Sequence, residues 1–184
     1  MSIFLLIILL AAGYVVYLAL QKPDEFRVVR SAAMRAAPEV IFPHLNNLRT
    51  GQNWSPWVEM EPNADYSFDG PEEGVGASVR WKGKKVGAGK QTITDSQPNA
   101  LVRSKLEFYK PLPGISIVDL TLTPEGDLTL VEWSMAGESK FINKLMSVFM
   151  DCEKMCGDQF DKGLGNLKAL VEGEPGGAVA DESA

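Results

Sequence analysis

The sequence predicts an α+β domain that follows an N-terminal transmembrane helix, and three observations lead to this fold class. Residues 3–20 contain no charged side chain. Segments in which apolar and polar residues alternate, separated by turn residues, fill the region from 64 to 137, which is typical of an antiparallel sheet. From 141 to 171, apolar residues recur at steps of three and four, which indicates one long helix lying along that sheet.

The apolar segment 3–20 is expected to cross a membrane. Its 18 residues reach about 27 Å as a helix, close to the hydrocarbon thickness of a bilayer. A cleaved signal peptide is the alternative, but it needs a basic start and a small-residue cleavage site. Only Met1 and Ser2 precede the run, and Leu18-Ala19-Leu20 ends it. We therefore expect residues 1–21 to be an uncleaved anchor that contacts the lipid bilayer through residues 3–20.

The charges beside this segment predict its orientation. Lys22, Arg27 and Arg30 follow the run, and no basic residue precedes it. Because basic residues accumulate on the cytoplasmic side of transmembrane helices, the C-terminal domain is expected in the cytoplasm.

The remaining chain divides into a domain, residues 22–172, and an acidic tail, residues 173–184, which is expected to be disordered. All 18 basic residues and all but three of the 24 acidic residues lie before the tail, so the domain carries a net charge of −3. This balance excludes a large basic field, and we expect no nucleic acid partner.

Within the domain, the first strand is expected over 25–35, where apolar residues alternate. Ala37-Pro38-Glu39 then opens a short helix, because proline fits the first helical position. A second short helical or irregular segment covers 47–57. The next six strands are expected over 64–68, 75–82, 87–96, 100–109, 115–123 and 127–137.

The last helix is expected to run without interruption from 141 to 171. Gly157, Gly163 and Gly165 lie in it, and they indicate either a close approach to the sheet or a bend. Cys152 and Cys156 share one face of this helix, where a spacing of four residues suits reduced, buried thiols better than a disulfide. A metal site would need further soft ligands, and the single histidine, His44, is over 100 residues away. No metal or other cofactor is expected.

Short motifs follow one another along residues 25–172. They are Phe26-Arg27-Val28 with Arg30-Ser31, Ala37-Pro38-Glu39 with Ile41-Phe42, Trp54-Ser55-Pro56-Trp57, Gly74-Val75-Gly76-Ala77, Pro124-Glu125-Gly126, Val131-Glu132-Trp133-Ser134-Met135, and Asp158-Gln159-Phe160-Asp161-Lys162-Gly163-Leu164 with Asn166-Leu167. In this order the chain resembles the SRPBCC superfamily of START-related, helix-grip proteins, and within it the bacterial polyketide cyclase/dehydrase-like branch.

This resemblance implies a helix-grip fold, in which a curved antiparallel sheet of about seven strands wraps around a long C-terminal helix. A hydrophobic cavity is expected between the sheet and the helix. It implies no particular reaction, because the superfamily includes carriers as well as enzymes. With the anchor, it leads us to expect a single-pass protein of a bacterial-type inner (cytoplasmic) membrane.

No catalytic residue can be assigned from the sequence. His44 has no recognisable partner, and Glu107, Asp119 and Glu132 alternate with apolar residues that face the core, so they should point outward. An enzymatic function is therefore less expected than a binding function.

The candidate residues for lining the cavity are aromatic residues, inward residues of the strands, and the methionine and cysteine side chains of the last helix. In small domains such residues also simply fill the core, and that alternative stays open. The candidates are Trp54, Trp57, Trp81, Val102, Leu106, Phe108, Val118, Leu120, Trp133, Met135, Met146, Phe149, Met150, Cys152 and Cys156.

A second group of residues is expected to face the membrane. Basic residues surround the turn at Gly83, where they either form a solvated hairpin or contact anionic headgroups. The membrane-facing candidates are Lys22, Arg27, Lys82, Lys84 and Lys85.

The favoured hypothesis is a membrane-anchored domain that binds a hydrophobic small molecule or lipid without catalysis. A second hypothesis is an accessory subunit of a larger membrane protein complex, which would dock through a helix face that contains Gly13, Tyr14 and Tyr17. A third is a polyketide cyclase-like enzyme, which would need polar groups that point into the cavity.

Overall fold

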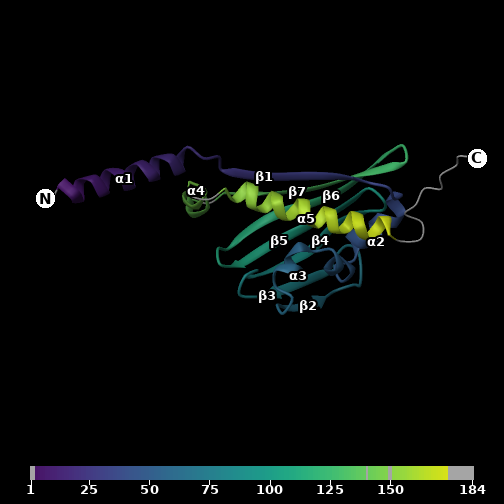
Figure 1. Ribbon diagram of the computed structural model, residues 1–184. Helices are drawn as coiled ribbons and strands as arrows, with labels where there is room; N and C mark the ends of the chain where they lie inside the picture. Colours follow the sequence, from purple (N-terminus) through teal and green to yellow (C-terminus); the bar gives the residue numbers. More distant parts are fainter. Residues whose placement is uncertain (1–2, 140, 149–150, 174–184) are drawn as a thin grey trace, which may run out of the picture.

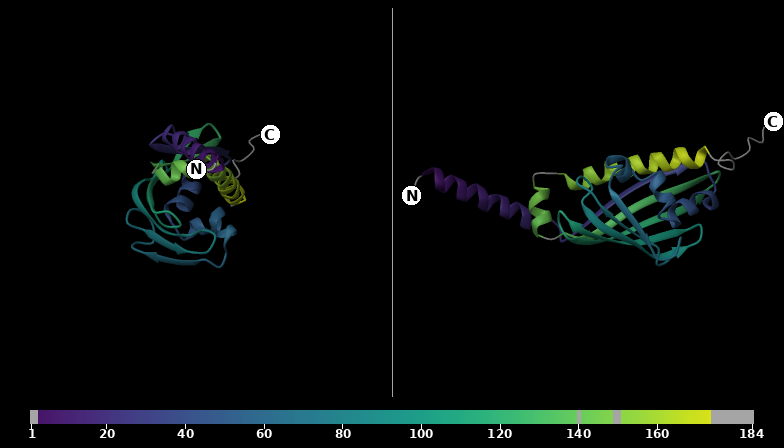
Figure 2. Two further views of the ribbon diagram at one scale, coloured as in Figure 1. Left: turned by 90° about the vertical axis from the view of Figure 1, so that its left-hand side faces the viewer. Right: turned by 90° about the horizontal axis from the view of Figure 1, so that it is seen from below.

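The computed structural model describes residues 3–139, 141–148 and 151–173, and it shows the predicted α+β helix-grip fold. A seven-stranded antiparallel sheet curves around a C-terminal helix, α5 (Cys152–Glu172), and the N-terminal helix, α1 (Ile3–Leu20), projects from one end of this domain (Figures 1 and 2). The rest of the predicted tail, 174–184, lies outside the described residues.

The sheet has the strand order β1-β7-β6-β5-β4-β3-β2. Strands β2 to β7 form a meander, and the first strand closes its edge by pairing with the last. The predicted strands are all present, with bounds that differ by up to about three residues. They are β1 (Glu25–Met34), β2 (Asp65–Asp69), β3 (Ser78–Lys82), β4 (Ala88–Gln97), β5 (Leu101–Lys110), β6 (Gly114–Glu125) and β7 (Leu128–Glu138).

Short helices connect the first two strands, as the sequence predicts. They are α2 (Pro38–Asn46), the 3-10 helix η1 (Thr50–Asn53) and α3 (Pro56–Met60). Proline occupies the start of α2 and of α3, where the missing N–H costs nothing because the first turn of a helix has no internal acceptor. In Figure 1, these helices lie on the same side of the sheet as α5.

The prediction of one uninterrupted helix over 141–171 was wrong. The structure has two helices, α4 (Phe141–Ser147) and α5. Asp151 accounts for the break, because its carboxylate accepts a hydrogen bond from the backbone N–H of Lys154 at 2.9 Å and so caps the start of a new helix. The periodicity of apolar residues does not reveal such a cap, because these residues continue at the same spacing before and after it.

The core lies between α5 and the concave face of the sheet. Phe160, Leu164 and Leu167 are at most 2% exposed on the helix, and they pack with Val28 and Val131 of the sheet. Each such side chain stabilises the fold by about 1.5–3 kcal/mol relative to its exposed state. The register of the sheet therefore fixes which residues face α5.

Gly163 lets α5 approach the sheet closely, which is one of the two roles predicted for the helix glycines. A Cβ atom at this position would lie 2.7 Å from Cζ3 of Trp133 and 3.0 Å from Cδ of Pro56. For Gly163→Ala we expect a net loss of about 1–2 kcal/mol in the free energy of unfolding, because overpacking outweighs the better helix propensity of alanine. Chemical denaturation followed by circular dichroism measures this change.

Gly165 is the matched control, because it lies in the same helix with open space around it. Gly165→Ala should stabilise the domain by about 0.5–1 kcal/mol. Equal effects of the two substitutions would contradict the assigned packing of Gly163.

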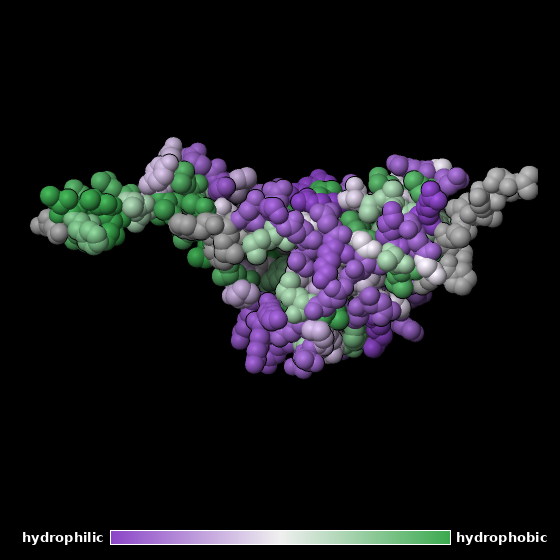
Figure 3. All heavy atoms as spheres, in the orientation of Figure 1, coloured by the Kyte–Doolittle hydropathy of each residue, from purple (hydrophilic) through white to green (hydrophobic). Residues whose placement is uncertain are grey.

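Helix α1 contacts the domain only near its C-terminal end among the residues described. Ala19 is fully buried there, whereas the other helix residues are exposed or half-buried, and the helix packs against α4. Asp24 fixes this junction, because its carboxylate pairs with Lys144 and its carbonyl accepts a hydrogen bond from the N–H of Ser139 at 2.7 Å. Figure 3 shows α1 as a hydrophobic rod outside the domain.

By length and composition, α1 could cross a membrane, with a mean hydropathy of 2.8 over 18 residues. A signal sequence near an N-terminus has the same properties.

Candidate ligand-binding cavity

A cavity of about 270 Å³ lies between the concave face of the sheet, the short helices and α5. Strands β2 to β7 supply inward side chains, because side chains alternate between the two faces of a strand. The segment from α2 to α3 forms the opposite wall, and Cys156 and Phe160 of α5 complete it. The register of the sheet therefore determines which strand residues point from the concave face into the cavity.

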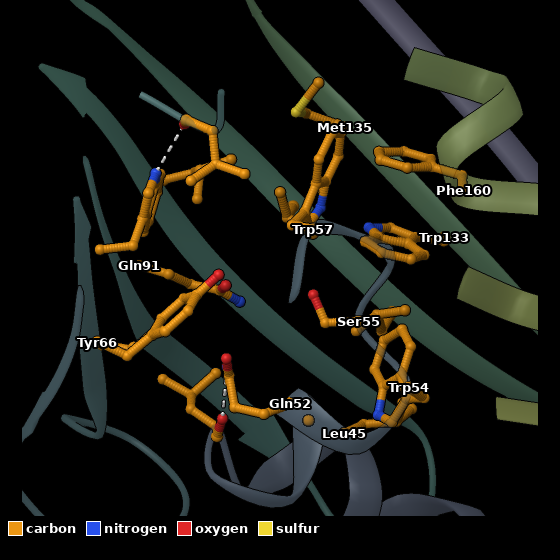
Figure 4. A pocket seen from close by; sticks show the side chains of 18 of the residues that line it. Leu45, Gln52, Trp54, Ser55, Trp57, Tyr66, Gln91, Trp133, Met135 and Phe160 are labelled. Atoms are coloured by element: carbon orange, nitrogen blue, oxygen red, sulfur yellow. Dashed lines mark hydrogen bonds between the residues drawn. The ribbon is translucent and has the colours of Figure 1, made fainter. Parts of the chain in front are cut away.

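One wall of the cavity is a packed group of aromatic rings. Trp133 of β7 stacks on Phe160 with ring centroids 4.2 Å apart and planes 5° from parallel. Trp54 meets the same indole edge to face at 5.3 Å. Figure 4 shows these rings beside Met135, on the far side of the cavity from Tyr66 and Gln91. Such contacts fix the rings in place, so this wall presents a rigid apolar surface.

Trp81 of β3 also lines the cavity. Its indole N–H donates to the carbonyl oxygen of Val86 at 3.2 Å, and its ring contacts Phe108 edge to face at 6.0 Å. The ring lies over Gly89 of the neighbouring strand, where a Cβ atom would collide with it. Glycine at this position therefore allows the indole to lie across β4.

Three buried polar atoms in the cavity wall have no hydrogen-bond partner among the described residues. They are Oε1 of Gln52, the hydroxyl oxygen of Tyr66 and Nε1 of Trp133. Burial and the charge of Glu61 raise the pKa of Tyr66 above its ordinary value of 10. At neutral pH its hydroxyl therefore stays protonated and can donate a hydrogen bond. Buried polar groups usually have partners, so these atoms indicate where a bound molecule would supply them.

The hairpin between β3 and β4 lies at one margin of the cavity, and Glu61 holds it. The Glu61 carboxylate accepts hydrogen bonds from the backbone N–H groups of Lys84, Lys85 and Val86 at 2.9, 2.7 and 3.1 Å. These bonds lower the pKa of Glu61. Because Lys85 and Val86 line the cavity, this carboxylate indirectly shapes it.

We expect the Glu61 carboxylate to make stability pH-dependent. Its pKa in the folded state lies below the ordinary value of 4.5, so its contribution is complete above the unfolded pKa and is lost as pH falls through the folded value. Glu61→Gln should lower stability at neutral pH and weaken the loss of stability below about pH 4.5. Denaturation at a series of pH values tests this.

Glu125→Gln serves as the control, because Glu125 is exposed at the distant end of β6, next to the turn that leads to β7. If Glu61→Gln and Glu125→Gln gave the same pH profile, the role assigned to Glu61 would be wrong.

The structure brings most of the predicted cavity residues together around one space. The candidates that line it are Trp54, Trp57, Trp81, Leu106, Phe108, Val118, Leu120, Trp133, Met135 and Cys156. Val102 does not line it and is buried in the core, 2% exposed. Phe149 and Met150 lie outside the described residues, as do the side chains of Met146 and Cys152.

Sequence reasoning missed the polar part of the cavity. Gln52, Ser55, Tyr66 and Gln91 line it together with His44. Gln91 lies in a strand with only weak alternation, and Gln52 lies in the 3-10 helix η1, which has no apolar period. Tyr66 alternates regularly with polar residues in β2, but that pattern does not show that its hydroxyl faces a cavity. Only the topology shows that these separate segments face one space.

Two of the three carboxylates expected to point outward form ion pairs with basic side chains and do not line the cavity. Asp119 pairs with Arg103 at 2.7 Å, and Glu107 pairs with Lys105 at 3.0 Å. Among the described residues that line the cavity, none is Asp or Glu.

The predicted membrane-facing residues Lys22, Arg27, Lys82, Lys84 and Lys85 are all exposed. They lie near the end of the domain from which α1 projects, because Lys82 and Glu25 occupy strand ends on that side. Their contact with a membrane remains a prediction.

Comparisons with known proteins agree with this architecture. The model of the family described as polyketide cyclase/dehydrase and lipid transport matches residues 25–172. The fold is similar to that of protein CV1439 from Chromobacterium violaceum, with a TM-score of 0.60, 19% identity, and coverage of 83% of this chain and 100% of that one. It is also similar to the Aha1 dimer from Colwellia psychrerythraea, with a TM-score of 0.57, 17% identity, and coverage of 80% and 96%. Among curated proteins, none matches the chain.

Proposed function

The chain belongs, over residues 25–172, to the polyketide cyclase/dehydrase and lipid transport family, and from this premise we propose that its cavity binds a hydrophobic small molecule or lipid at a membrane without catalysis. The observation that supports this most is the partly enclosed cavity of about 270 Å³, lined by all four tryptophans of the chain. This volume is slightly below that of ordinary ligand pockets, which are about 300–1,000 Å³.

The proposed ligand has an apolar body and one polar end. The aromatic and aliphatic walls favour the apolar part, because burying it releases about 25 cal/mol for each Å² removed from water. The polar end would accept a hydrogen bond from the Tyr66 hydroxyl and donate one to Oε1 of Gln52, since both atoms otherwise lack partners among the described residues. A carboxylic acid, an alcohol or an amide on an acyl chain or a small ring system has this chemistry.

Binding without catalysis is favoured by the ionisable groups of the cavity. General acid–base catalysis by carboxylates needs an Asp or Glu within hydrogen-bond reach of the substrate. The described lining contains neither, and apart from His44 and Lys85 its polar residues are mainly amides and hydroxyls, such as Gln52, Ser55 and Gln91. These groups orient a ligand by hydrogen bonds, but at neutral pH they are weak acids and bases.

The proposed location is a bacterial inner membrane, with α1 as an uncleaved anchor and the domain in the cytoplasm. The apolar length of α1 and the basic residues Lys22 and Arg27 after it support this arrangement. The contacts of Ala19 and Asp24 with the domain also support retention, because cleavage after the apolar run would remove a buried residue of the junction.

Contact quenching of the intrinsic fluorescence tests ligand binding directly. The full chain in phospholipid nanodiscs is titrated with 9,10-dibromostearic acid, whose bromine atoms quench tryptophan only near contact. Because all four tryptophans line the cavity, we expect saturable quenching with one acid bound per chain. Quenching that rises in proportion to the acid without saturation would show partition into the bilayer only, and it would overturn the proposal.

A further inference from the structure

One end of the domain collects the elements that lie nearest to α1. The registers pair Glu25 with Glu138, and Ala88 with Lys110, so the start of β1, the end of β7, the β5–β6 loop and the β3–β4 hairpin share one end of the sheet. Helix α4 follows β7 at this same end, beside the last turn of α1 (Figure 1). We call this the α1-side end.

Exposed apolar side chains gather at the α1-side end. Outside α1, the described large apolar residues that are exposed are Val75, Tyr109, Ile115, Ile117, Phe141, Ile142 and Met155. All except Val75 lie on α4, at the start of α5 or at the ends of β5 and β6. Single apolar residues on a surface are ordinary, but a cluster at one end indicates a contact surface. We call Tyr109, Ile115, Phe141, Ile142 and Met155 the apolar rim.

The junction with α1 fixes the height of this rim relative to a bilayer. The 18 residues of α1 span about 27 Å, so a helix that crosses the hydrocarbon core ends at its surface. Helix α4 packs directly against that end, and Lys144, only 7% exposed, pairs with Asp24 in the connection. With only four residues between α1 and β1, the rim has no long spacer that would hold it away from the lipid.

The cavity opens at the same end. Lys85 and Val86 of the β3–β4 hairpin line it, as does Cys156, one residue after Met155 of the rim. Figure 3 shows a hollow with apolar walls on the side toward α1, between the start of α5 and a hydrophilic region at the hairpin. The exposed lysines Lys84 and Lys85 thus lie beside the opening, where anionic headgroups would attract them by up to about 1 kcal/mol each.

We propose that the apolar rim contacts the lipid bilayer, so that the cavity exchanges its ligand with the lipid phase and not with water. The proposal rests on the proposed function, because it requires α1 to span the membrane. A bilayer fits the rim better than a second copy or a protein partner, because the rim is continuous with the end of α1 and is accompanied by exposed lysines.

Photo-crosslinking in the full chain tests the contact. Phe141 or Tyr109 is replaced by p-benzoyl-L-phenylalanine, and the chain is irradiated in nanodiscs that contain phosphatidylglycerol. Val75 is the matched control, because it is 59% exposed and follows β2 at the opposite end of the sheet. We expect at least about tenfold more lipid adduct by mass spectrometry at positions 141 and 109 than at 75. Equal yields, or adducts with a second chain or a co-purified protein, would overturn the proposal.

A kinetic experiment tests the exchange route. Ile142→Glu places a charge on the rim without touching the cavity lining, and Val75→Glu places the same charge at the opposite end. Dibromostearic acid is delivered from donor vesicles, and tryptophan quenching is followed in time. We expect Ile142→Glu to slow uptake at least about tenfold while the final quenching is unchanged, and Val75→Glu to leave both unchanged. Equal rates in all three proteins would overturn the route.

Failure of this inference can be distinguished from failure of the proposed function. If saturable quenching and stable insertion in nanodiscs are both present but crosslinking and rates show no rim effect, only the inference fails. If the chain does not insert through α1, the proposed anchor fails and the inference fails with it.

Discussion

Val118→Phe should weaken ligand binding at least about tenfold. Val118 is 6% exposed and points from β6 into the cavity, opposite Met135 on β7. A benzyl group at this position occupies space that the ligand needs, and one methylene too many in an apolar pocket already costs about 1–3 kcal/mol of binding free energy. Titration with dibromostearic acid measures the change as a shift of the half-saturation point.

Ile117→Phe is the matched control for this substitution. Ile117 is the preceding residue of β6, its side chain faces the outer surface, and it is 41% exposed. The control should bind with unchanged affinity. If both variants bound equally well, the ligand would lie elsewhere, and the cavity would have to be a packing defect.

Trp133→Ala should lower the free energy of unfolding by about 3–5 kcal/mol. Trp133 is 7% exposed, stacks on Phe160 and meets Trp54 edge to face, so its removal leaves two aromatic rings without their partner. Gly163 faces the same ring and has no side chain that could fill the gap. Chemical denaturation followed by circular dichroism measures the loss.

Trp133→Phe separates packing from hydrogen bonding at this position. It keeps an aromatic ring but removes Nε1, which has no partner among the described residues. We expect a smaller loss of stability than for alanine, because the phenylalanine ring can still stack on Phe160. If alanine and phenylalanine destabilised the domain equally, stacking on Phe160 would not be the main contribution of this residue.

The sequence predicts the sheet well because strand signals are local. Alternation of Val118, Leu120 and Leu122 marks the inner face of β6, and turn residues such as Pro124 and Gly126 lie at its end. The long helix was predicted less well, since the cap at Asp151 depends on one hydrogen bond that hydrophobic periodicity does not show. Local chemistry therefore predicts elements more reliably than their exact ends.

The apolar part of the candidate site was also accessible from sequence, because Trp54, Trp81 and Trp133 are large and lie in segments with a recognisable order. The polar part was not. Tyr66 and Gln52 are separated by a short helix and a turn, and their polar atoms face one cavity only because the fold brings β2 and η1 to it. Such a convergence of distant segments needs the folded structure.

The proposed membrane role connects these observations. In this proposal, helix α1 positions the α1-side end at the lipid surface, where the cavity with its apolar walls would open. An anchored domain of this kind would withdraw a molecule from the bilayer over a short distance, without exposing its apolar part to water.

Mass spectrometry of the protein as isolated tests the central claim most directly. The full chain is released from native membranes into nanodiscs, ejected intact and then dissociated, beside Val118→Phe and Ile117→Phe prepared in the same way. We predict one apolar molecule with a single polar end bound to the wild-type chain and to Ile117→Phe, and at least about tenfold less of it on Val118→Phe. Equal amounts of the molecule on all three proteins, or none on the wild-type chain, would contradict a ligand-binding cavity.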